Sequence, residues 1–164
     1  MCYSVDSVNQ MGEPEFVEVF GAVFEETPQI ARCVWGDRPF LNREDLHQKM
    51  VAVVEQMTLD DKIALIRAHP ELGKPGKIAA ASAREQASAG FSSAAQEDYQ
   101  QITELNAQYR KKFEFPFVMA VKGQTLKSIE ADLKGRIGNK REEEIVRSLS
   151  EIYEIARFRL SDLI

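Results

Sequence analysis

The sequence predicts an all-α protein, a single compact domain of roughly eight helices that spans residues 1–164. Three observations support this fold class. Apolar residues recur at spacings of three and four along most of the chain, which is the pattern of amphipathic helices. The chain has 164 residues, a length at which one domain buries a core of its own. It contains no internal repeat, low-complexity tract or linker that would divide it into separate domains.

The first half of the chain predicts four helices. Two short ones are expected over residues 14–24 and 28–34, each with a proline near its first turn. The third, over residues 42–57, carries apolar side chains on one face. The fourth begins after Thr58, because Thr58 and Asp61 have the spacing of an N-cap and its acidic N3 partner.

The second half predicts two longer amphipathic helices and one exception. The helices cover residues 92–113 and 145–163, and a break at residues 138–139 precedes the second. Between them, residues 115–121 are β-prone and lie between charged residues and Gly123, which predicts one short extended buried segment. Its main chain would lack helical hydrogen bonds, so a polar ligand could become a partner. A hydrophobic plug between helices explains the pattern equally well.

Composition excludes several functions. The net charge is -5 and no long Lys/Arg block is present, which argues against nucleic-acid binding. No run of about 18 apolar residues predicts a membrane span. The N-terminus lacks the features of a secretory signal, and Cys2 and Cys33 suggest neither a disulfide framework nor a zinc site. The expected location is therefore cytoplasmic. Metal-binding, dinucleotide and phosphate-loop motifs are missing, so neither a metal nor a cofactor is predicted.

His69 is the first candidate for chemistry. It follows a predicted apolar helix and precedes Pro70, which favours ending the helix at this point. The negative end of the helix dipole should raise the pKa of the imidazole and favour its protonated form. Such a group suits proton donation near neutral pH. A solvent-exposed helix cap is the simpler alternative, and on local grounds alone it is the better one.

Glu85 is the second candidate. The run Ser82-Ala-Arg-Glu85 has the spacing of a capping box, in which Ser82 caps a helix and Glu85 reaches back to it. A helix N-terminus is also a natural site for an anion. Both readings stay open from the sequence.

Four motifs in this order resemble a known family. They are His69-Pro-Glu-Leu72, Ser82-Ala-Arg-Glu-Gln86, Leu105-Asn106-x-x-Tyr109 and Lys112-Phe-x-Phe-Pro-Phe117. Together they resemble the OHCU decarboxylase family, whose substrate is 2-oxo-4-hydroxy-4-carboxy-5-ureidoimidazoline. Phe24-Glu25 near the start and Arg159-Leu160 near the end are similar to the same family, so the resemblance covers nearly the whole chain.

The resemblance implies an all-helical homodimer that converts OHCU to (S)-allantoin and carbon dioxide in urate breakdown, without a cofactor. It implies that His69 is the catalytic acid/base, and we expect Glu85 to act with it. It further implies substrate contacts from Pro70, Ser82, Ala83, Arg84, Gln86, Phe117, Val118, Met119, Ala120, Val121 and Arg159. Arg157 is the alternative to Arg159. The stretch between His69 and Glu85 is shorter than in many relatives, so no role follows for residues 73–81.

Two other functions fit the same residues. A non-enzymatic helical interaction module would use His69 and Glu85 as helix caps and residues 117–121 as core. A paralogue could keep the pocket and act on a related ureido acid.

Overall fold

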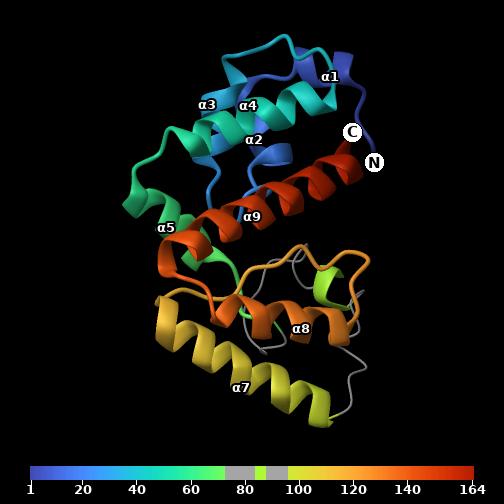
Figure 1. Ribbon diagram of the computed structural model, residues 1–164. Coiled ribbons are helices and arrows are strands. Elements are labelled where there is room, and N and C mark those ends of the chain that lie inside the picture. The colour runs from blue at the N-terminus through green and yellow to red at the C-terminus, as the bar shows by residue number, and fades with distance from the viewer. Residues whose placement is uncertain (73–83, 88–95) are drawn as a thin grey trace. The chain divides into compact units, whose positions relative to one another are not determined.

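The structure, a computed structural model, describes residues 1–72, 84–87 and 96–164. Within these ranges every regular element is a helix (Figure 1), so the predicted all-α class is confirmed. The chain divides into two compact units. The first comprises Met1–Leu65 and Tyr153–Ile164, and the second comprises Ile66–Ile152. The single domain expected over residues 1–164 stays a prediction.

The first unit contains the short N-terminal helices, most of α5 and the end of the last helix. Its helices are α1 (Val5–Gln10), α2 (Glu13–Phe20), α3 (Gln29–Trp35) and α4 (Arg43–Glu55), with α5 (Leu59–Ala68) and α9 (Arg141–Leu163) continuing into the second unit. α3 packs against both α2 and α4. Their apolar faces supply the buried side chains that the helical periodicity predicts, among them Phe16, Phe20, Val34, Leu46 and Met50.

Local sequence signals explain where these helices begin and end. The Thr58 hydroxyl accepts a hydrogen bond from the Asp61 N–H at 3.2 Å, which confirms the predicted N-cap. Asn42 caps α4 in the same way, accepting from the Asp45 N–H at 2.9 Å. α2 ends at Phe20, earlier than the expected residue 24. A Cβ at Gly21 would lie 2.4 Å from the Val17 carbonyl oxygen, so the chain requires glycine there.

The second unit contains α7 (Gln96–Phe113) and α8 (Leu126–Ile137), which pack side by side (Figure 1), and the first part of α9. Residues 92–95 of the helix expected over 92–113 lie outside the described residues. The expected break at residues 138–139 separates α8 from α9, but α9 begins at Arg141 rather than at residue 145. Sequence analysis named neither α1 nor α8.

Residues 115–121 form the predicted exception. They adopt neither helix nor turn beyond a bend at Phe115, and all of them are buried. Phe115 and Phe117 have no exposed area, and both rings contact the ring of Tyr109 on α7 edge to face. The extended buried segment is therefore confirmed, and the question is which groups satisfy its main chain.

His47 on α4 is one of the two histidines of the chain, and it is buried. Its Nε2 lies 2.8 Å from the Tyr153 carbonyl oxygen.

None of the helices in the described part of the chain has the length and apolar character of a membrane span.

Candidate active site

His69 is the first residue after α5. Its N–H still donates to the Ile66 carbonyl oxygen at 3.2 Å, and Pro70 then ends the helix because proline has no N–H to continue the pattern. The residue is buried, with 6% of its surface exposed. The alternative that His69 is a solvent-exposed helix cap is therefore wrong, because the residue is not exposed. A buried imidazole suits a site from which water is excluded.

The turn that follows His69 is held by α7. The Asn106 amide Nδ2 donates to the Leu72 carbonyl oxygen at 3.0 Å, and both residues are buried. One helical turn further along, Arg110 reaches the Glu71 carboxylate at 3.4 Å. Within the described part of the chain, the other amide atom, Asn106 Oδ1, has no hydrogen-bond partner. Asn106 thus fixes the main chain directly after His69, a role that its motif alone did not indicate.

Residues 84–87 form one helical turn in the second unit. Arg84 is exposed, Glu85 is partly buried and Gln86 is buried. Ser82 and Ala83, and with them the predicted capping box, lie outside the described residues. Because Gln86 is the buried residue of this turn, its side-chain amide is the one that can form hydrogen bonds inside the protein.

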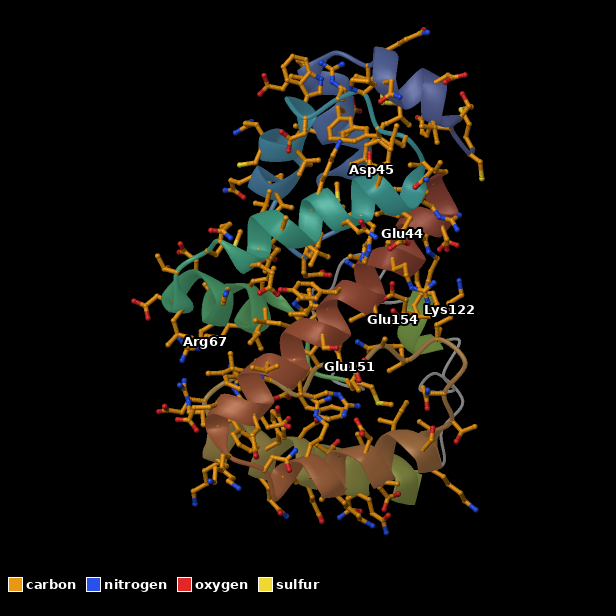
Figure 2. All side chains as sticks on the ribbon, turned by 45° about the horizontal axis from the view of Figure 1, so that its top comes forward. Glu44, Asp45, Arg67, Lys122, Glu151 and Glu154 are labelled. Carbon is orange, nitrogen blue, oxygen red and sulfur yellow. The ribbon has the colours of Figure 1, made fainter. Side chains whose placement is uncertain are left out.

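Side chains form hydrogen bonds with two main-chain groups of the extended segment, and the Val121 carbonyl oxygen accepts a third bond from the Gln124 N–H at 3.0 Å. The Val118 carbonyl oxygen accepts a hydrogen bond from Arg136 Nη1 at 2.8 Å. The Ala120 N–H donates to Glu151 Oε2 at 3.2 Å, and Figure 2 shows Glu151 on α9. No described residue forms a hydrogen bond with the main chain of Met119, which lies between them. Side chains therefore supply part of the hydrogen bonding that a buried main chain needs, and a ligand contact at Met119 stays a prediction.

A further contact connects the end of α5 to the start of this segment. Arg67, labelled in Figure 2, donates from Nε to the Glu114 carbonyl oxygen at 3.0 Å. Glu114 has a φ of 64°, the left-handed conformation that often follows a helix. It turns the chain from α7 into residues 115–121. Arg67 precedes His69 by two positions, so it joins the histidine region to the extended segment.

Arg159 belongs to the first unit and is paired there. Its Nη1 lies 2.9 Å from Glu25 Oε2, and the same nitrogen donates to the carbonyl oxygens of Ala22 and Val23 at 3.3 and 3.4 Å. Arg159 and Glu25 are 6% and 4% exposed. Sequence analysis placed Glu25 in a family motif without giving it a role. Glu25 and Arg159 are 134 positions apart in the sequence, so no local pattern indicated that they pair.

Arg157, the alternative to Arg159, has different surroundings. It lies on the exposed face of α9 and pairs with Glu154. Hydrogen bonding to that guanidinium lowers the pKa of the Glu154 carboxyl. A solvated pair of this kind is ordinary surface chemistry, so the contrast in burial favours Arg159 as the arginine of a site.

Known proteins resemble this chain throughout its length. The model of the OHCU decarboxylase family matches residues 9–161. The chain belongs to the OHCU decarboxylase family. It is 36% identical over 160 residues to 2-oxo-4-hydroxy-4-carboxy-5-ureidoimidazoline decarboxylase of Halalkalicoccus jeotgali, covering 98% of this chain and 91% of that protein.

Two other relatives differ in length. The uric acid degradation bifunctional protein PucL of Bacillus subtilis is 38% identical over 162 residues, and the match covers 99% of this chain but 33% of PucL. This chain thus spans about a third of that protein. The crystal structure of (S)-allantoin synthase matches with a TM-score of 0.81 at 24% identity, covering 98% of this chain and 54% of that one. At this identity the structural match supports the OHCU decarboxylase fold and no more.

Proposed function

We propose that this protein decarboxylates 2-oxo-4-hydroxy-4-carboxy-5-ureidoimidazoline (OHCU) to (S)-allantoin and carbon dioxide, as a carboxy-lyase of urate breakdown. The observation that carries the proposal is family membership across residues 9–161, in a chain whose motif histidine, His69, is buried. Curated relatives of similar length carry the name of this decarboxylase.

The chemistry of the substrate explains what the protein has to do. OHCU carries a hydroxyl and a carboxylate on one ring carbon, next to a carbon that is doubly bonded to nitrogen. When the bond to the carboxylate breaks, carbon dioxide leaves and the electron pair of that bond moves into the ring, where the imine nitrogen accepts the charge and takes up a proton. The resulting enol loses its hydroxyl proton, and the carbon bearing the ureido group gains a proton to give allantoin. The substrate thus contains its own electron sink.

Within this reaction, His69 transfers the proton of the substrate hydroxyl, and Glu85 orients that hydroxyl. The burial of His69 supports its role, because a water-poor site strengthens the interactions that orient a proton transfer. Residues 117–121 supply main-chain contacts, and the Met119 amide groups, which no described residue engages, suit a ureido group that offers both a donor and an acceptor. Pro70, Arg84 and Gln86 contribute to the same pocket, as do Ser82 and Ala83, which lie outside the described residues.

Arg159 holds a ring or ureido oxygen in this proposal. Pairing it with the leaving carboxylate would stabilise the ground state and oppose loss of carbon dioxide. Its buried pair with Glu25 supports an orienting role, since the carboxylate offsets the charge of the guanidinium and fixes its position. A product complex with Arg159 on a carboxylate mimic would contradict this assignment.

The test is a direct assay on freshly generated OHCU, with the chiral product followed by circular dichroism. We expect His69→Ala to keep the fold and lose nearly all turnover. Substantial activity in the folded variant would refute the assignment of His69. Turnover of another ureido acid in preference to OHCU would identify a paralogue instead.

Glu85→Gln separates catalysis from helix capping, because a glutamine still caps. We expect a large loss of activity with an unchanged melting temperature. A lower melting temperature with normal turnover would assign Glu85 to the cap alone.

We also propose a homodimer, in line with the family resemblance, to be tested by light scattering of the purified chain. The cytosol is the proposed location, because a reducing compartment keeps the two exposed free thiols, Cys2 and Cys33, reduced.

A further inference from the structure

The second unit buries an ion pair that the proposed reaction does not use. Arg136 on α8 and Glu144 on α9 are 2% and 0% exposed, and Arg136 Nε lies 2.8 Å from Glu144 Oε1. Removing two charges from water is expensive, and apolar residues of the same size often stabilise a protein as well. The contacts of this pair therefore indicate what it does beyond filling the core.

Arg136 holds the middle of the extended segment. Its Nη1 donates to the Val118 carbonyl oxygen at 2.8 Å. Its guanidinium lies over the Phe117 ring, 4.5 Å from the centroid. The third nitrogen, Nη2, donates to the Ser148 hydroxyl at 3.3 Å. One rigid, planar group thus holds both a ring and a carbonyl of adjacent residues.

Glu144 fixes the guanidinium. Its Oε1 accepts hydrogen bonds from Arg136 and, at 2.6 Å, from the Tyr109 hydroxyl on α7. Its Oε2 accepts from Asn139 Nδ2 at 3.0 Å. Burial, together with the hydrogen bond to Glu144, raises the pKa of Tyr109, so the hydroxyl stays a donor at every pH of interest. Groups from α7, α8 and the turn between α8 and α9 therefore converge on one carboxylate of α9, which orients Arg136.

A second carboxylate holds the segment two residues further on. Glu151 Oε2 accepts from the Ala120 N–H at 3.2 Å, while Arg147 holds Glu151 Oε1 at 2.9 Å. The main chain of Met119 lies between these two bonded groups and forms no hydrogen bond with a described residue.

We infer that Arg136, oriented by Glu144, is a positioning residue for the reaction: it fixes the main chain at Val118 so that residues 117–121 meet the substrate in a defined geometry. This inference rests on the proposed function, in which that main chain binds OHCU. Arg136 acts only through the extended segment. Loss of its contact with Val118 should therefore weaken substrate binding more than it slows the chemical step.

The test compares Arg136→Lys with Ser148→Ala. Lysine keeps the charge beside Glu144, but its single ammonium cannot reproduce the fork that spans Glu144 and Val118. Ser148→Ala removes another hydrogen bond of the same guanidinium and leaves the contact with Val118 intact. Kinetics on OHCU are measured together with amide hydrogen exchange of the peptide covering residues 113–122.

For Arg136→Lys we expect KM to rise about tenfold, with kcat changed much less, and exchange in the peptide to speed up by about the same factor. Ser148→Ala should match the wild type in KM and in exchange. Simple destabilisation would instead lower apparent kcat through loss of folded enzyme and leave KM unchanged. The inference is wrong if folded Arg136→Lys has the KM and the exchange rate of the wild type. It is also wrong if Arg136→Lys and Ser148→Ala have equal effects.

Two further outcomes are decisive. If Arg136→Lys does not fold, the double variant Arg136→Met/Glu144→Gln removes both charges, keeps an acceptor for Tyr109 and is judged by the same criteria. If this variant also fails to fold, the pair serves folding itself and the inference is wrong. If the wild type does not convert OHCU, the proposed function fails, and the exchange measurement alone decides whether Arg136 positions the segment.

Discussion

The buried pair of Arg159 and Glu25 leads to a quantitative prediction. Glu25→Gln removes the negative charge and keeps an oxygen that can accept from Arg159 Nη1, now 2.9 Å from the carboxylate. The two side chains are 7% and 4% exposed, so solvent cannot replace the lost charge. Removing one partner of a buried pair costs about 3–5 kcal/mol. Because one hydrogen bond survives, we expect a loss of roughly 2 kcal/mol in the free energy of unfolding.

The assay is urea denaturation followed by the fluorescence of Trp35, the single tryptophan, which lies in the same unit as the pair. With a typical urea dependence, the expected loss moves the unfolding midpoint by about 1 M. Glu154→Gln is the matched control, because it neutralises the partner of Arg157 in an exposed pair. It should leave the midpoint unchanged. Equal midpoints for the two variants would refute the reasoning from burial.

Three further predictions concern other parts of the chain. A hydrogen bond from the Leu41 N–H lowers the pKa of Asp45 below its ordinary value of 3.8. The ionised carboxylate therefore stabilises the folded state above pH 3.8. This contribution is lost as the pH falls through the lower pKa that Asp45 has in the folded protein. Stability measured from about pH 5 to pH 2 should therefore fall less steeply in Asp45→Asn than in the wild type. Asn106→Leu removes the amide that holds the Leu72 carbonyl and should lower kcat/KM on OHCU by about tenfold, whereas a wild-type value would deny Asn106 a part in placing the histidine turn. Thr58→Ala removes the cap of α5 and should cost about 1 kcal/mol of stability in urea denaturation, with KM unchanged.

Much of the fold follows from short-range signals in the sequence. The N-caps at Asn42 and Thr58, the prolines at the starts of α2 and α3, and the stripe of α7 each operate within a few residues, and such patterns are visible in one sequence. α1 has only six residues, too few for periodicity to identify. α8 contains Gly135, a residue that disfavours helices, and this weakened the helical signal of its sequence.

The candidate site was predicted less completely, because its supporting contacts join distant residues. Motifs identified His69 and residues 117–121, and the structure buries both, although burial was predicted only for the segment. Nothing local pairs Glu25 with Arg159 or Asn106 with the Leu72 carbonyl. Arg136 and Glu144 lie on either side of the break at residues 138–139, where each looks like an ordinary solvated charge. Only the contacts of Tyr109 on α7 and Arg136 on α8 with Glu144 on α9 show that these charges are buried together.

The extended segment shows how these two kinds of information combine. From the sequence, an unpaired buried main chain implied that partners must exist, and a ligand was one of them. The structure supplies protein partners for Val118 and Ala120 and none among the described residues for Met119. A decarboxylase whose substrate carries its own electron sink has to hold that substrate in one orientation, and rigid main-chain donors and acceptors do so with little reorganisation during the reaction. The buried pair of Arg136 and Glu144 fixes the Val118 carbonyl when the protein folds, and under the proposed function this pair supports the site without contacting the substrate.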